Sequence, residues 1–130
     1  NRTTVYLRSH VHKRWLNMAA TSQNFELWQG EDEQVEVPVT DGENPVSLTG
    51  AAVEWGMWHG DTRLITKATG SGITLANNAA VDDAIVIALE AADTATVAPG
   101  YYSHECRVQK GGDYQVVFTG VVTIQRSRTV

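Results

Sequence analysis

The sequence predicts an all-β protein, an antiparallel β-sandwich of about seven or eight strands preceded by an extended N-terminal arm. Short segments with strand patterns recur roughly every 8–12 residues, as they do in sandwiches and barrels. Turn residues separate these segments, and the chain has 11 glycines but only 3 prolines. Its 130 residues, of which 42% are hydrophobic, suffice for one core. We therefore expect an arm over residues 1–24 and a single β-sandwich domain over residues 25–130.

Eight segments carry the strand pattern. In the second of them, Val35, Val37 and Val39 alternate with polar residues. Pro38 has no N–H to donate, so this strand is expected at a sheet edge. The segment at residues 84–89 is apolar throughout, which is typical of a strand in a sandwich core, and it is too short for a helix. The expected strands are residues 25–29, 35–39, 52–58, 63–68, 73–75, 84–89, 101–109 and 114–126.

Alternation also predicts which side chains share a face of the sheet. Trp55 is expected in the core, and Leu48 can fill the core from a turn. Residues 90–97 are expected to form a short loop or a single helical turn. Gly120 interrupts the last strand, where we expect a bulge or a bend. The sets that share a face are Val53, Trp55 and Met57; Tyr102, His104, Cys106 and Val108; and Val116, Phe118, Val122 and Ile124.

Residues 1–24 differ in charge from the rest of the chain. Residues 1–16 contain four basic residues and no acidic one, whereas all 15 acidic residues lie from Glu26 onward. Such a basic arm would complement an acidic surface on a neighbouring subunit. Apolar side chains in the arm should also dock on this domain or on a neighbour instead of staying in water. The arm residues predicted to contact other subunits are Arg2, Arg8, Lys13, Arg14, Trp15, Leu16 and Met18.

No catalytic or metal-binding motif is recognisable in the sequence. Cys106 is the only cysteine, so no intrachain disulfide can form, and we interpret it as a small buried hydrophobe. His104 lies two residues away on the same side of a strand, but nothing else indicates a catalytic pair. His10 and His12 would share a face on a strand, yet no third metal ligand lies nearby. We therefore expect no enzyme activity, no metal and no cofactor.

The composition also argues against several classes of ligand. No apolar run of about 18 residues is present, which argues against a membrane partner. Four basic arm residues would give only a modest, salt-sensitive affinity for nucleic acid, and the acidic body would oppose it. Exposed tryptophans can stack on sugar rings, and Trp28 and Trp58 are the candidates for ligand stacking. A carbohydrate-binding or host-surface-binding β-sandwich module is accordingly the alternative function.

Five motifs follow one another over about four fifths of the chain. A polar loop at residues 29–32 precedes a valine-rich strand that ends in Thr-Asp-Gly at residues 40–42. Residues 45–51, PVSLTGA, are close to a P-x-D-L-T-G-A turn, and an aromatic-bearing strand with a charged hairpin follows them. Residues 99–105, PGYYSHE, are similar to a G-x-Y-x-Y-D pattern, and residues 118–124, FTGVVTI, to a closing strand with G-x-x-x-V. Together they resemble the immunoglobulin-like domains at the start of bacteriophage baseplate upper proteins and of related tail, head-fibre and decoration proteins.

This resemblance implies an immunoglobulin-like β-sandwich without an active site. Ser47 stands where the pattern usually has an acidic residue, and residues 1–24 precede the pattern. The resemblance further implies a structural protein of a tailed-bacteriophage particle, in the capsid decoration, neck, tail or baseplate, acting through protein–protein contacts. The expected partners are other virion proteins and copies of the chain itself, with no small-molecule substrate. The expected location is the virion, after synthesis in the cytoplasm of the bacterial host.

Overall fold

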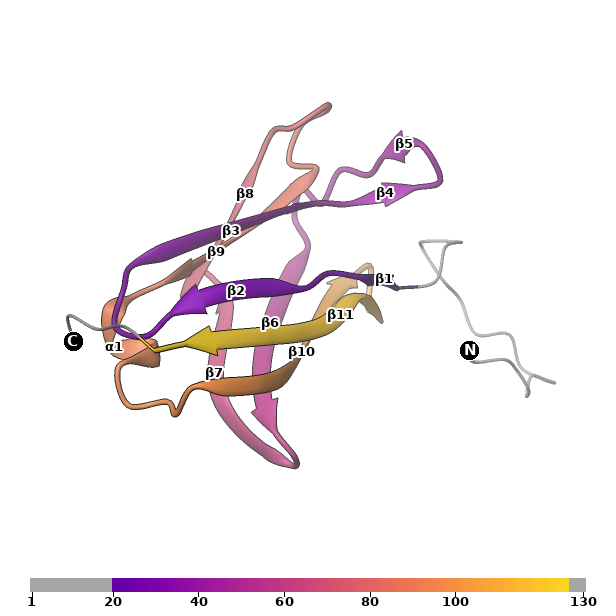
Figure 1. The fold of residues 1–130 in the computed structure, drawn as a ribbon. Coiled ribbons are helices and arrows are strands. Elements are labelled where there is room, and N and C mark those ends of the chain that lie inside the picture. Colours follow the sequence, from indigo (N-terminus) through magenta and orange to yellow (C-terminus); the bar gives the residue numbers. More distant parts are fainter. Residues whose placement is uncertain (1–19, 127–130) are drawn as a thin grey trace, which may run out of the picture.

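The computed structural model describes residues 20–126 and shows an all-β fold (Figure 1). Within this range there are eleven strands and one helical turn, α1 (Ala91–Thr94). Three strands have two residues each: β1 (Thr21–Ser22), β4 (Thr40–Asp41) and β5 (Asn44–Pro45). The longer strands are β2 (Phe25–Trp28), β3 (Glu33–Pro38), β6 (Ala52–His59), β7 (Thr62–Thr69), β8 (Gly72–Ala76), β9 (Ala84–Leu89), β10 (Gly100–Lys110) and β11 (Asp113–Gln125).

Nine of these strands form one curled sheet, and β4 and β5 pair with each other. The order along the sheet is β1-β11-β10-β6-β7-β8-β9-β3, and β2 also pairs with β11. Strands β3, β9 and β8 follow the order B, E and D of an immunoglobulin domain, and β11, β10 and β6 follow G, F and C. The predicted immunoglobulin-like class is confirmed. The two halves are not separate sheets, however, because a short parallel pairing of β7 with β8 joins them.

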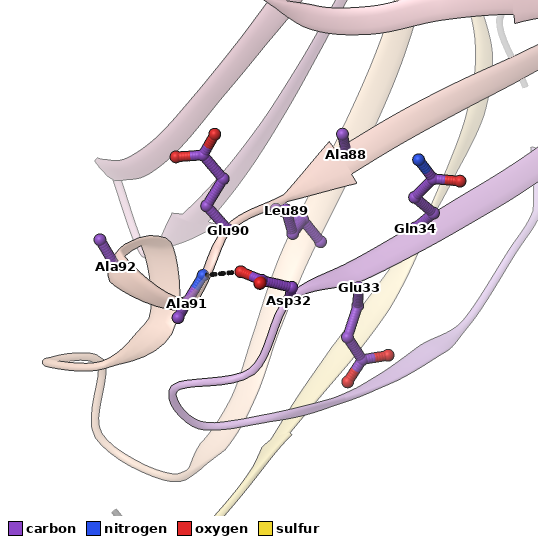
Figure 2. Close-up of a pocket in the computed structure, with 8 residues that line it drawn as sticks. All are labelled: Asp32, Glu33, Gln34, Ala88, Leu89, Glu90, Ala91 and Ala92. Carbon is purple, nitrogen blue, oxygen red and sulfur yellow. Dashed lines mark hydrogen bonds between the residues drawn. The ribbon is translucent and has the colours of Figure 1, made fainter.

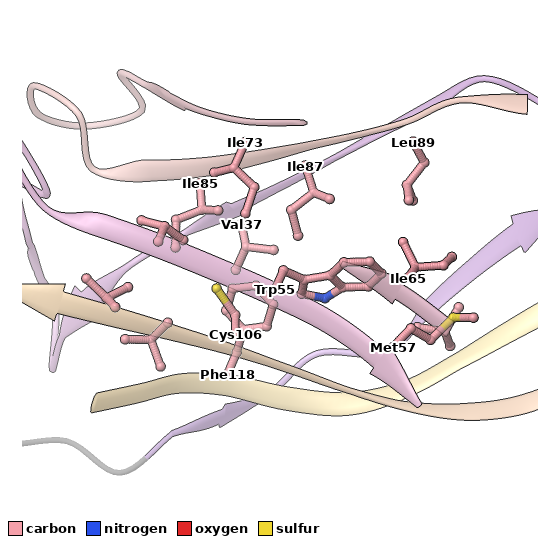
Figure 3. Packing of buried hydrophobic residues seen from close by; sticks show 14 of the residues in the cluster. Val37, Trp55, Met57, Ile65, Ile73, Ile85, Ile87, Leu89, Cys106 and Phe118 are labelled. Carbon is pink, nitrogen blue, oxygen red and sulfur yellow. The ribbon is translucent and has the colours of Figure 1, made fainter. Parts of the chain in front are cut away.

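The core lies between the two halves of the curled sheet. Trp55, Met57 and Cys106 from one half meet Ile73 and Ile87 from the other, and all five side chains are almost fully buried (Figure 3). Interior packing of this kind is favourable because each large apolar side chain removed from water contributes about 1.5–3 kcal/mol. The core position predicted for Trp55 is confirmed, as is the filling of the core by Leu48.

One predicted face is wrong in β11, where alternation breaks. The pairing of β10 with β11 shifts between Cys106, opposite Phe118, and Arg107, opposite Val116. Val117 is the extra residue of this bulge, and its side chain is buried. Val116 therefore lies on the outer face and not beside Phe118. The bulge predicted near Gly120 lies at Val117 instead, and Gly120 pairs regularly with His104.

The edge position predicted from Pro38 is confirmed, since β3 ends the strand order. The register also explains why proline is tolerated there. Val39 donates its N–H to the carbonyl of Asp83, 2.8 Å away, in line with the β3–β9 pairing. Because N–H directions alternate along a strand, Val37 also faces β9, and the nitrogen of Pro38 faces away from it. The missing N–H therefore costs no ladder hydrogen bond.

Candidate subunit-contact surfaces

The seven arm residues predicted to contact other subunits, Arg2 to Met18, lie outside the described residues. What the structure does describe is how the chain joins the domain after them. Residues 21–24, the last of the predicted arm, run beside β11 in parallel. This segment is held to the sheet by specific contacts. It therefore belongs to the folded domain.

This segment, the crossing from β1 to β2 along the edge of β11, comes closest to β11 at Gly120. Gln23 donates its backbone N–H to the carbonyl of Thr119 at 2.7 Å, and the side-chain oxygen of Asn24 accepts from the N–H of Val121 at 2.9 Å. A Cβ added at Gly120 would lie 2.0 Å from the carbonyl oxygen of Gln23, well inside contact distance. Gly120 is therefore required because two backbones approach each other too closely for a side chain.

A buried histidine completes this crossing. His104 is 2% exposed, and its Nε2 lies 2.5 Å from the carbonyl oxygen of Gln23. On the other side of the ring, Trp55 donates its indole N–H to Nδ1 at 3.0 Å. Since an indole nitrogen only donates, Nδ1 must accept, and the neutral ring carries its proton on Nε2, which donates to Gln23. Burial lowers the pKa of His104, and the bond to Gln23 opposes this only in part.

The sequence grouped His104 with Cys106 on one side of a strand but gave no sign of this role. Phe25 stacks on the His104 ring with 4.6 Å between ring centroids, so the crossing segment covers the histidine on a third side. Cys106, two residues on, is fully buried, and burial raises the pKa of its thiol far above the ordinary value. With both His104 nitrogens engaged, the pair has no free base to activate the thiol.

The outer face of β11, β10, β6 and β7 carries a row of three charged side chains flanked by two aromatic rings. The guanidinium of Arg107 lies over the Tyr114 ring and binds Glu54 at 3.0 Å. Glu54 also pairs with Arg63 at 3.4 Å. Arg63 in turn lies over Trp58, with its Cζ 4.5 Å from the ring centroid. Each charged side chain of this outer-face row therefore has a partner within the row. Tyr, Arg and Trp are also the residue types enriched among the side chains that contribute most to binding at protein interfaces.

The two stacking candidates lie in different settings. One face of the Trp58 ring is covered by Arg63, and the ring edge lies against Gly56, so little of it is offered to a sugar. Trp28, at the end of β2, is 43% exposed. Tyr101, which was not among the predicted stacking residues, is 78% exposed on the same outer face, in line with Thr123 of β11 and Glu26 of β2. Trp28 and Tyr101 are therefore both exposed on this outer face, whereas Trp58 is stacked on its own domain.

A shallow groove of about 580 Å³ lies at the end of the domain that carries α1 (Figure 2). Asp32 closes one side, where its carboxylate accepts the N–H of Ala91 at 2.7 Å. Glu90 and Gln34 point to the same side of the ribbon, whereas Glu33 points the other way and accepts the N–H of Trp28 at 3.1 Å. The lining residues are Asp32, Glu33, Gln34, Ala88, Leu89, Glu90, Ala91 and Ala92, and none is basic.

Among residues 20–126, no three histidine, cysteine, aspartate or glutamate side chains are grouped as a metal ion would require. His10 and His12 lie outside that range. No helix in the described part of the chain is long and apolar enough to cross a membrane.

Comparison with solved structures finds the same fold in a phage protein. The N-terminal domain of ORF48 of phage TP901-1 matches 81% of this chain and 88% of its own length, with a TM-score of 0.55 and 10% sequence identity. The ectodomain of BTLA matches 85% of this chain and 96% of its own length, with a TM-score of 0.45 and 16% identity. No model of a protein family matches the chain, and no curated protein sequence matches it.

Proposed function

We propose that this chain is a structural protein of a tailed-bacteriophage particle and acts through protein–protein contacts. The observation that carries the proposal is the fold shared with a domain of a phage protein, over 88% of that domain. The ordered motifs from residue 29 to residue 124 point in the same direction. Within residues 20–126 the buried titratable groups, such as His104 and Cys106, serve the core, while charged and aromatic side chains gather on outer surfaces suited to contacts.

The arm is the proposed anchor to other virion proteins. Its apolar residues would be buried on a neighbouring subunit, and its four basic residues would orient the contact. Residues 21–24 belong to the domain itself, since they bind β11 and His104. A truncation that tests the anchor should therefore remove residues 1–19 and leave the crossing segment intact.

The test uses purified particles from a phage whose own copy of this gene is inactivated and supplied in trans. The full chain should appear in the particles by mass spectrometry, and cryo-EM should show its position. The chain lacking residues 1–19 should keep its melting temperature yet remain in the free protein fraction. Incorporation of the truncated chain would refute the anchor, and absence of the full chain from particles would refute the proposed function itself.

One observation favours the second candidate, a carbohydrate-binding or host-surface-binding module. Trp28 and Tyr101 are large, exposed aromatic side chains on the same outer face. Binding of the full chain to a glycan array, lost on Trp28→Ala but kept on Trp58→Ala, would support that candidate. Equal binding of all three proteins would exclude Trp28 as a sugar platform.

A further inference from the structure

The open edge of β3 is a place where another strand can pair. β3 is bonded to β9 on one side, and within residues 20–126 no strand lies on its other side. The alternation fixed by Val39 directs the N–H and carbonyl groups of Gln34 and Glu36 outward. Such unpaired backbone groups are a template for pairing with a further strand.

The other terminal strand is less open to pairing. β2 has only four residues, and the carboxylate of Glu33 already accepts the N–H of Trp28, which points away from β11. β3 has six residues, and among residues 20–126 no side chain caps Gln34 or Glu36 in this way. Pro38 limits pairing to the first part of β3, which is the part that borders the acidic groove at Asp32 and Glu90.

Charge around this edge selects the incoming strand. Glu36 lies on the exposed side of β3, and Asp32 and Glu90 line the groove. The carboxylate of Asp32 accepts the backbone N–H of Ala91, and none of the residues that line the groove is basic. Two β3 edges would repel each other, because both carry these acids. A basic segment would be attracted, and the chain contains one, residues 1–16, with four basic residues and no acid.

We infer that the open edge of β3, with its acidic groove, receives the basic N-terminal arm of a second copy of this chain. The direction of the chain favours a second copy. β1 lies at the end of the domain away from α1, and β2 runs from there toward α1 (Figure 1). A chain's own arm would have to reverse and run back along the domain to reach the groove. Nineteen residues can span up to about 65 Å when extended, enough to reach a neighbour.

This inference rests on the proposed function, because arm exchange links subunits only in an assembly. It is tested with full-length chains that carry one engineered cysteine each, Ser9→Cys in the arm or Gln34→Cys on β3. Cys106 is buried and does not compete for a crosslinker. When the two chains are mixed with a short bismaleimide, a crosslinked heterodimer should form in at least about tenfold greater yield than with Asp61→Cys, in the exposed turn between β6 and β7, in place of Gln34→Cys.

A charge reversal gives an independent measurement on the same surface. Glu36→Lys should weaken self-association of the full chain about tenfold in analytical ultracentrifugation, because it places a like charge opposite the basic arm. Asp61→Lys makes the same change in net charge far from the groove and should leave the dissociation constant nearly unchanged. Added salt should weaken the association of the unchanged protein, as screening requires.

The outcomes separate this inference from the proposed function. A chain with both Ser9→Cys and Gln34→Cys that crosslinks only within itself would show that the arm covers its own edge and would overturn the inference. A full chain that stays monomeric and gives no crosslink at Gln34→Cys would also overturn it. If the chain lacking residues 1–19 still failed to enter particles, the proposed function would stand, with the arm bound to a different virion protein.

Discussion

The two edges of the curled sheet differ in whether another segment of the chain covers them. At β11 the chain covers the edge with its own β1 and β2, and three residues fit that crossing closely: Gly120, Asn24 and His104. At β3 the edge remains uncovered within residues 20–126, and the groove beside it is lined by acidic residues, Gln34 and small or apolar residues, none of them basic. The difference teaches that a permanent contact is specified by steric fit and buried hydrogen bonds, whereas an exposed edge is controlled by charge and proline.

The largest expected effect comes from proline substitutions that compare the two sides of β3. Val35→Pro removes an N–H that the register directs toward β9, so we expect a loss of about 3 kcal/mol or more in the free energy of unfolding. Glu36→Pro removes an outward N–H, two residues before the proline that is already tolerated, and should cost about 1 kcal/mol or less. Denaturant unfolding of both variants, with Val35→Ala to correct for lost side-chain burial, measures the difference.

Equal losses for the two proline variants would mean that the outward side of β3 is already bonded. In that case the open edge, and the inference drawn from it, would be wrong. Retained stability with weaker self-association in Glu36→Pro would locate the incoming strand on that side.

A second comparison probes the closed end with two similar glycines. Gly120 and Gly100 have nearly the same φ, +156° and +151°, but only Gly120 has atoms within 4 Å of an added Cβ. Gly120→Ala should therefore destabilise the domain by about 2–3 kcal/mol more than Gly100→Ala, because the Gln23 carbonyl must move. Thermal unfolding of the two variants tests this. Similar losses would show that the crossing segment shifts easily and is not held by fit.

His104 gives the closed end a pH dependence. Its pKa in the folded protein lies below the ordinary value of 6.5, so below pH 6.5 the unfolded chain binds a proton that the folded chain does not. Stability should fall with decreasing pH through this window, by up to about 1.4 kcal/mol per pH unit from this group. Protonation would place a second donor opposite the Trp55 indole.

His104→Gln should cost about 2 kcal/mol at pH 7.5, since it leaves buried partners without their hydrogen bonds. The same substitution should reduce the loss of stability between pH 7.5 and 5.5, measured by denaturant unfolding. An unchanged pH profile would show that His104 is not the group responsible.

The sequence predicted the fold better than the surfaces, for physical reasons. A continuous apolar run identified β9, and alternation identified the inward face of β10, because a strand buries both of its sides or one. Alternation failed at Val116, since a bulge depends on the partner strand and leaves no mark in a single strand's pattern. The role of Gly120 was missed likewise, because Gln23 approaches it from a segment nearly a hundred residues away in the sequence.

The candidate surfaces show the same limit. Net charge predicted a basic arm and an acidic body, and exposed aromatics predicted Trp28 as a platform candidate. The groove could not be predicted, because Asp32 and Glu90 meet only when β3, β9 and α1 are placed together. Arg63 of β7 stacks on Trp58 of β6 in space that a side chain at Gly56 of β6 would occupy. Strand periodicity does not reveal this contact between two strands.

The smallest expected effects distinguish paired charges from those at the open edge. Glu54 binds both Arg63 and Arg107 on the outer face, so Glu54→Gln should destabilise the domain by about 0.5 kcal/mol, and less at high salt. Glu36 has no ion pair within residues 20–126, and Glu36→Gln relieves repulsion among the acids near β3. Its effect on the truncated chain should be zero or a stabilisation of about 0.3 kcal/mol.

In the full chain Glu36→Gln should weaken self-association, because the incoming basic arm loses a partner, while Glu54→Gln should not. A destabilised truncated chain with Glu36→Gln would mean that this carboxylate already supports the fold and is not held free for a neighbour.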